Sequence, residues 1–180
     1  MLIDPQHSTL LIVDIQERLF PAIEGGEALL AHSLWLLQVA QRLGVPVLAT
    51  EQYPKGLGPT LAALRERLGA PALVEKIHFS AAAEPGLFAA PGGERRQFVV
   101  CGTEAHVCVL QTVLDLLGQG RQVFVVAEAV GSRRAGDKAL ALERMRQAGA
   151  AIVSREMVAF EWLQRAGTEL FRAISREFIR

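Results

Sequence analysis

The stretch Phe98-Val-Val-Cys-Gly-Thr-Glu-Ala-His-Val-Cys-Val-Leu-Gln-Thr112 decides the fold of this chain. It begins with apolar β-formers, Gly102 interrupts them, and from Ala105 onward apolar residues recur at helical spacing. The pattern predicts a buried strand, a sharp turn and a helix with Cys108 in its first turn. Because unpaired N–H groups and the helix dipole favour an anion there, we expect the Cys108 thiol to ionise easily. Free cysteines are also among the most buried residues, so a merely packed Cys108 is the alternative.

The composition indicates a folded protein with a sizeable core. Its 180 residues are 51% hydrophobic, and 19 basic side chains balance 19 acidic ones. Disorder is not expected of such a chain, and no charge excess favours nucleic acid or an anionic membrane as a partner. Two cysteines make no disulfide framework, and we recognise neither a secretory leader nor an apolar run of about 20 residues. We therefore expect one domain over residues 1–180, cytoplasmic, with reduced thiols.

Strands and helices alternate along the chain. Apolar runs predict strands at 9–14, 45–50, 73–76, 98–101, 122–127 and 151–154. Amphipathic patterns predict helices at 27–43, 60–68, from 105 onward, and at 137–147, 156–164 and 168–179. Glycine- and proline-containing segments at 51–59, 81–97 and 128–132 read as loops. This alternation predicts an α/β fold: a doubly wound, six-stranded parallel sheet of order 3-2-1-4-5-6 with helices on both faces, three layers in all.

Three reactive side chains follow predicted strands: Asp14 the first, Lys76 the third and Cys108 the fourth. The first and fourth strands are neighbours at the switch point of such a sheet, so Asp14 and Cys108 are expected to meet there, with Lys76 reaching in. A thiolate can attack, a carboxylate can take and return the proton, and an ammonium can raise the thiolate population. The alternative is an Asp14–Lys76 salt bridge beside an inert thiol.

Three segments carry a family resemblance: Leu11-Ile-Val-Asp14-Ile-Gln16, Glu75-Lys76-Ile-His-Phe79-Ser80 and Gly102-Thr-Glu-Ala-His-Val-Cys108-Val. Together they resemble the signature regions of the isochorismatase-like cysteine hydrolases, and the resemblance covers nearly the whole chain. It implies that Asp14, Lys76 and Cys108 form the catalytic triad. It also implies a cis peptide at Thr103–Glu104, which turns the Glu104 N–H to join that of Cys108 in an oxyanion hole.

Departures from the family pattern narrow the expected chemistry. Nicotinamidases in this family carry metal-binding histidines after the second strand, whereas residues 50–59 hold none, so we expect neither metal nor cofactor. True isochorismatases lack the nucleophile that Cys108 would provide. The resemblance is strongest to the isochorismatase-domain branch. It implies a cysteine-dependent hydrolase that cleaves a small-molecule amide through a thioester, with the substrate left open. The alternative is a catalytically silent scaffold of the same fold with a redox-sensitive thiol.

Other residues complete the expectations. The substrate pocket is expected to include Gln16, Phe20, Tyr53, His78, Phe79 and Thr103. A Cys108–His106 dyad is disfavoured, because a spacing of two puts the side chains on different faces of a helix. Arg133 and Arg134 read as a solvated loop. A homo-oligomer, dimer or tetramer, is expected from apolar residues that a small monomer does not easily cover: Leu87, Phe88, Trp162, Leu163, Phe171 and Phe178.

Overall fold

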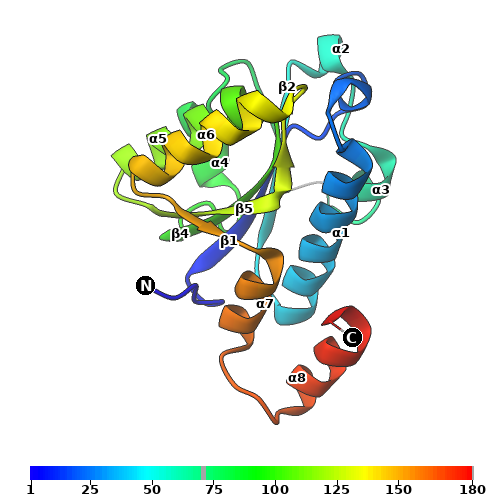
Figure 1. The fold of residues 1–180 in the computed structure, drawn as a ribbon, viewed down its shortest axis with the longest axis vertical. Coiled ribbons are helices and arrows are strands. Elements are labelled where there is room, and N and C mark those ends of the chain that lie inside the picture. Colours follow the sequence, from blue (N-terminus) through cyan, green and yellow to red (C-terminus); the bar gives the residue numbers. More distant parts are fainter. Residues whose placement is uncertain (70–71, 180) are drawn as a thin grey trace.

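The computed structural model describes residues 1–69 and 72–179, and a six-stranded parallel sheet runs through it (Figure 1). The strand order is β3-β2-β1-β4-β5-β6, which confirms the predicted order. The strands are β1 (Ser8–Val13), β2 (Val47–Gln52), β3 (Leu73–Lys76), β4 (Gln97–Thr103), β5 (Gln122–Gly131) and β6 (Ala151–Val153). All register pairs are parallel, so the carboxyl ends of the strands share one edge.

Helices cover both faces of the sheet, as predicted (Figure 1). One face packs against α1 (Gly26–Leu43) and α7 (Arg155–Leu163), and the other against α5 (Leu110–Gly118) and α6 (Ala135–Gln147). Shorter helices are α2 (Pro54–Leu57), α3 (Ala62–Arg65), α4 (Pro85–Ala89) and α8 (Glu169–Ile174). Single turns occur at Phe20–Ala22 and Ala81–Ala83, and π-helical turns at Ala105–Val109 and Ser175–Ile179. None of the helices in residues 1–69 and 72–179 has the length and apolarity needed to span a bilayer.

The central strands are buried on both faces because helices cover each side. Every residue of β1 and β4 is buried. Successive side chains of a strand point to opposite faces, so Leu10 and Ile12 pack in the cluster that includes α1, and Leu11 and Val13 in the cluster that includes α5. The apolar runs of the sequence therefore become a core with two halves, one on each face of the sheet.

Gly102 allows β4 to approach β1 closely near the edge where the strands end. Its φ of +123° is a conformation that residues with side chains rarely adopt, and a Cβ atom there would lie 2.0 Å from the Val13 carbonyl oxygen. The pairing with β5 also shifts at this point: Val100 pairs with Val125, but Gly102 pairs with Val130. The β4 strand thus continues past the glycine to Thr103, two residues beyond the predicted end.

Several element boundaries differ from the predicted ones. β2 extends to Gln52, because the polar residues that read as a loop pair with β3 and are buried. β5 extends to Gly131, because Ala129 and Val130 are buried and pairing with β4 resumes after the register shift. The helix predicted at 60–68 is the single turn Ala62–Arg65, and part of the predicted loop at 81–97 forms α4. Residues 70–71 and 180 lie outside the described residues.

The C-terminal segment docks on α1. The Trp35 indole N–H donates to the Phe178 carbonyl oxygen at 2.8 Å, and the two rings meet edge to face with centroids 6.3 Å apart. Arg42 and Glu177 form an exposed ion pair at 2.8 Å beside them. Figure 1 shows α8 at the end of the molecule opposite α2, and hence away from the edge where the strands end.

Candidate active site

Asp14 and Lys76 meet at the carboxyl edge of the sheet. Asp14 directly follows β1, and Lys76 is the last residue of β3. The Lys76 Nζ lies 2.7 Å from the Asp14 Oδ2, and both side chains are fully buried. The Asp14 backbone has a φ of +49°, a rare conformation for a residue with a side chain, and such outliers gather at functional sites. A buried carboxylate–ammonium pair therefore lies where open α/β folds place their sites.

Residues of β2 hold this ion pair from the strand between. Thr50 donates from its hydroxyl to Asp14 Oδ1 at 2.6 Å, and Lys76 Nζ donates to Gln52 Oε1 at 2.6 Å. The ammonium also donates to the carbonyl oxygens of Phe79 at 2.9 Å and of His78 at 3.3 Å. The close contact from Nζ to Asp14 Oδ2 lies outside hydrogen-bond geometry, so Oδ2 is buried without a hydrogen bond to any residue that the structure describes. That oxygen can still accept a proton.

Sequence reasoning missed Thr50 and Gln52. They lie at the carboxyl end of β2, in register with Val13 and Lys76 respectively. The segment Thr50-Glu-Gln52 read as a strand end followed by a loop. A signal was present, since polar residues at the carboxyl end of a strand next to β1 fall in the crevice where ligands bind.

Cys108 lies in the π-helical turn that follows β4, and its side chain is mostly buried, with 6% of the residue exposed. The pKa of its thiol is raised to about 12, mainly by burial; the negative charge of Asp14 contributes to this rise, and the positive charge of Lys76 opposes it. The prediction that this thiol ionises easily is therefore wrong for the unliganded protein. Loss of water around the sulfur outweighs the helix N-terminus, so the resting thiol keeps its proton.

The turn between β4 and Cys108 is held at several points. The Thr103–Glu104 peptide is cis, as the resemblance implies. The Thr103 hydroxyl donates to the Asp14 carbonyl oxygen at 2.6 Å. The Glu104 carboxylate accepts from Nε of Arg133, with Nη2 of the same guanidinium 3.3 Å from its second oxygen. Arg133 was expected to lie in a solvated loop, and its side chain is indeed 57% exposed; its head group also binds the Glu104 carboxylate, whose side chain is only 10% exposed.

The expected pocket residues have different surroundings. Gln16 is fully buried; its amide donates to the carbonyl oxygens of Gln52 and Gly58 and accepts from the Gln52 N–H, so its polar atoms are used within the protein. Thr103 is likewise engaged by Asp14. Tyr53 and Phe79 are about half exposed.

The side chains of two further candidates, Phe20 and His78, contact other residues. Phe20 packs against Gly26 at the start of α1. The exposed His78 ring pairs with Glu84 at 2.9 Å.

His106 contacts Ser132 rather than Cys108. Its Nδ1 lies 2.9 Å from the Ser132 hydroxyl, and its Nε2 lies 4.0 Å from the Asp137 carboxylate. Ser132 directly follows β5 and Asp137 lies in the first turn of α6, so the histidine ties the turn around Cys108 to these two elements. This arrangement agrees with the expectation that the two side chains point to different faces.

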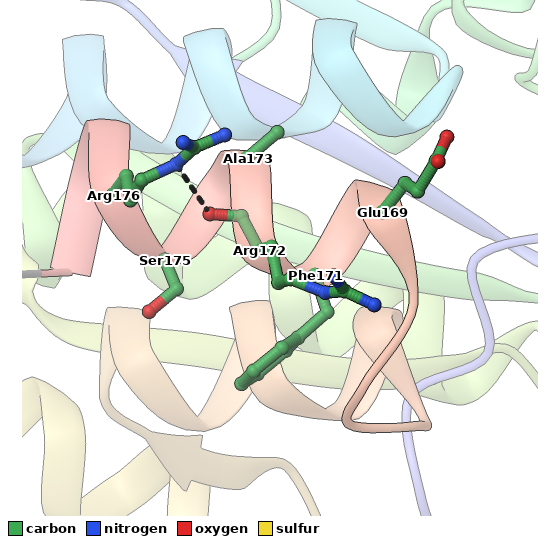
Figure 2. A pocket seen from close by; sticks show the side chains of 6 residues that line it. All are labelled: Glu169, Phe171, Arg172, Ala173, Ser175 and Arg176. Carbon is green, nitrogen blue, oxygen red and sulfur yellow. Dashed lines mark hydrogen bonds between the residues drawn. The ribbon is translucent and has the colours of Figure 1, made fainter.

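Two further features bear on ligands. Within residues 1–69 and 72–179, no three His, Cys, Asp or Glu side chains form a group able to hold a metal ion. A surface hollow of about 690 Å³ is lined by Glu169, Phe171, Arg172, Ala173, Ser175 and Arg176 (Figure 2). Because α2 follows β2 at the carboxyl edge of the sheet and α8 lies at the opposite end of the molecule, this hollow is far from that edge (Figure 1).

Residues 8–157 match the isochorismatase domain, and the chain belongs to this family. It is 38% identical over 176 residues to isochorismatase domain-containing protein 2A of Mus musculus, covering 96% of this chain and 82% of that one. It is 40% identical over 162 residues to isochorismatase domain-containing protein 1 of Danio rerio, covering 88% of this chain and 56% of that protein. The predicted membership in the isochorismatase-like cysteine hydrolases is thus confirmed, and it supports hydrolase activity in general.

Solved structures resemble this chain over almost its whole length. A protein named as the MAR1 ribonuclease of Caenorhabditis elegans has a TM-score of 0.90 and 33% identity, covering 98% of this chain and 91% of that one. The YcaC gene product of Escherichia coli, described as an octameric hydrolase of unknown specificity, has a TM-score of 0.89 and 22% identity, covering 99% and 91%. At that identity, the second likeness speaks for the fold alone.

Proposed function

We propose that this protein is a cysteine hydrolase that cleaves the C–N bond of a small-molecule amide through a thioester, without a metal or cofactor. The proposal is supported by the buried Asp14–Lys76 pair at the carboxyl edge of the sheet and by Cys108 in the turn after β4, the strand that pairs with β1. Among the described residues, Asp14 Oδ2 is buried and has no hydrogen bond, Lys76 Nζ lies 2.7 Å from it, and both charges act on the thiol of Cys108. Membership of a hydrolase family supports this reading.

In the first half of the proposed reaction, the Cys108 sulfur attacks the carbonyl carbon of the amide. The thiol proton passes to Asp14 Oδ2 as the S–C bond forms, and the electrons of the C=O double bond move to oxygen. This order suits a thiol that keeps its proton at rest, because a base must remove the proton during the attack. The backbone N–H groups of Glu104 and Cys108 are the proposed hydrogen-bond donors to the oxyanion. In the described part of the chain, the Glu104 N–H donates to no protein oxygen.

In the second half, the tetrahedral adduct collapses, the C–N bond breaks, and Asp14 returns the proton to the leaving amine. Water then attacks the thioester while Asp14 accepts one of its protons. As this second tetrahedral adduct collapses, the S–C bond breaks, Asp14 passes the proton it took from water to the Cys108 sulfur, and the acid product leaves. Throughout, Lys76 balances the charge of a carboxylate that is alternately protonated and ionised, and the acceptors from Gln52 and Phe79 keep the ammonium in place.

The proposed substrate is small because the candidate nucleophile is only 6% exposed. The name of the Caenorhabditis elegans neighbour makes RNA a substrate worth testing on this chain as well. Equal numbers of basic and acidic residues do not provide the charge excess with which proteins bind a polyanion. We therefore favour an uncharged or modestly charged amide over a nucleic acid.

We also propose that the protein is a homo-oligomer, a dimer or tetramer. Two of the residues that suggested it, Leu87 and Trp162, are buried in the core and give no support. Other apolar side chains do: Leu2, Phe160 and Leu170 are each 46–73% exposed. The octamer described for the Escherichia coli protein shows that the fold can assemble. A monomeric mass at micromolar concentration, measured by light scattering, would overturn this proposal.

A panel of small primary amides, N-substituted amides, esters and an unstructured RNA, assayed with wild type and Cys108→Ala, tests the function. The expected result is turnover of some amides by wild type and none by the variant, with an acyl adduct on Cys108 in the intact mass after rapid quenching. Full activity after dialysis against a chelator is expected. If no compound is turned over and no adduct forms, the scaffold alternative with a redox-sensitive thiol is favoured.

A further inference from the structure

The peptide that carries the Glu104 N–H is held from several sides in this structure. On its N-terminal side, the Thr103 hydroxyl donates to the Asp14 carbonyl oxygen at 2.6 Å. The Glu104 carbonyl oxygen accepts from the N–H groups of Val107 and Val109, each at 3.1 Å. The remaining hold is the Glu104 side chain, whose only described ion pair is with Arg133.

The Arg133–Glu104 contact joins two different strands. Glu104 directly follows β4, and Arg133 lies two residues beyond the end of β5. Both nitrogens, Nε and Nη2, face the carboxylate, which is the forked arrangement that fixes direction as well as distance. The Glu104 side chain is 10% exposed whereas the Arg133 side chain is 57% exposed, so the arginine reaches in from the surface to a carboxylate that is nearly enclosed.

We infer that Arg133 is a positioning residue: it holds the Glu104 side chain so that the Glu104 N–H points at the developing oxyanion. The inference rests on the proposed function, since it concerns the oxyanion site of the same reaction. An N–H donor stabilises a transition state only when it is already aimed at the oxygen, and a misplacement of about 1 Å can cost about a hundredfold in rate. A carboxylate without its arginine can rotate toward water and carry the peptide with it.

The test uses a reaction that needs an oxyanion site but no turnover. Propionaldehyde adds reversibly to a cysteine thiol: the S–C bond forms, the C=O double bond becomes a C–O bond, and the thiol proton is taken up by Asp14. The oxygen of this hemithioacetal occupies the position of the amide oxyanion. The readout is the aldehyde concentration that half-protects Cys108 from alkylation by iodoacetamide, followed by intact mass. Alkylation without aldehyde is the internal control, because displacement of iodide creates no oxyanion.

Arg133→Ala is expected to raise the half-protecting concentration about ten- to a hundredfold and to leave the alkylation rate without aldehyde within twofold. Arg134→Ala, which removes the neighbouring exposed guanidinium, should change neither quantity. Arg133→Lys keeps the charge but not the forked contact, so its half-protecting concentration should lie between those of Arg133→Ala and Arg134→Ala. Glu104→Gln should match Arg133→Ala, and the double variant should be no worse than either, because both substitutions break one contact.

Several outcomes would overturn the inference. One is unchanged protection in a folded Arg133→Ala protein, and another is an equal effect of Arg134→Ala. A third is a parallel loss of alkylation in Arg133→Ala, which would indicate general disruption of the site. Absence of any protection in wild type would show that the Glu104 N–H stabilises no oxyanion. The amide panel gives an independent result: aldehyde protection without amide turnover would refute the proposed hydrolysis and leave the role of Arg133 intact.

Discussion

The two cysteines of this chain are both buried, yet their surroundings differ in the way that matters for chemistry. Cys101, in β4, packs in the cluster that includes α1, and Cys108 packs on the other face of the sheet in the cluster that includes α5. The pKa of each thiol is raised to about 12, and burial is the main cause for both. At Cys101 the Ser33 side chain is the opposing influence, whereas at Cys108 the charges of Asp14 and Lys76 act on the sulfur.

The comparison shows that a raised thiol pKa does not distinguish a structural cysteine from a candidate nucleophile. What distinguishes Cys108 is a buried oxygen able to take its proton and a buried ammonium to balance the charge. The comparison also disfavours Cys101 and Cys108 as a redox pair, because both thiols are free and they belong to core clusters on opposite faces of the sheet. The following experiments test what the two sulfurs share and where they differ.

Replacing each sulfur by oxygen should give the largest difference. Cys108→Ser is expected to lower kcat on the amide found in the panel by more than about 10⁴-fold, because a serine hydroxyl is a far weaker acid than a thiol and gains little from the site. Cys101→Ser should keep kcat within a few fold, since its sulfur only packs. Steady-state kinetics on the two purified variants measures both values. Substantial activity in Cys108→Ser would assign the nucleophile elsewhere.

Removing the proton acceptor should have the next largest effect. Asp14→Asn keeps the shape of the side chain and the hydrogen bond from Thr50, but its amide cannot take up the thiol proton. We expect kcat to fall by about 10²–10⁴-fold, the contribution of a general acid–base group. The pKa of Cys108, followed by alkylation against pH, should fall at the same time, because the carboxylate that raises it is gone. Cys101 alkylation in the unfolded protein serves as the reference for the reagent.

Lys76→Ala removes the positive charge that opposes the rise in the pKa of Cys108. Loss of the ammonium should raise the pKa of Cys108 further, since Lys76 is the charge that lowers it. It also leaves the Asp14 carboxylate buried without a counter-charge, which typically costs about 3–5 kcal/mol of unfolding free energy. Alkylation against pH and urea unfolding measure the two effects. A well-folded variant with an unchanged Cys108 pKa would remove Lys76 from the mechanism and leave an Asp14–Lys76 salt bridge with a structural role.

The free energy of unfolding at high pH should show the contribution of Cys101, the cysteine that only packs. A thiol whose pKa is about 12 in the folded protein and about 9.0 unfolded is protonated in both states at pH 8, but only in the folded state near pH 10. The unfolded state thus binds fewer protons in this window, and the free energy of unfolding falls as pH rises. Each cysteine should contribute a loss of about 1.4 kcal/mol between pH 8 and pH 10. Urea unfolding of wild type and Cys101→Ala at the two pH values should differ by that amount, whereas equal losses would contradict it.

The sequence predicts the sheet order, both helical layers and the residues of the buried ion pair. Apolar runs give the strands, and the positions of Asp14 and Lys76 at strand ends follow from the common edge of a parallel sheet. The electrostatic state of Cys108 could not be predicted, because the helix N-terminus is visible in sequence but the water lost around the sulfur is not. The contact between Arg133 and Glu104 could not be predicted either, because it depends on how far β5 extends after the register shift at Gly102.

The close approach at Gly102 has a consequence for how such a chain can diversify. A side chain at this position would collide with the Val13 carbonyl oxygen, so any replacement must separate β1 from β4 just before Asp14. Position 108 carries no comparable restriction on the backbone. In a library randomised at both positions and selected only for folding, we expect glycine alone to survive at 102 while many small residues survive at 108. A lineage can thus lose or exchange its nucleophile by drift and regain it later, whereas the glycine has to persist through every intermediate.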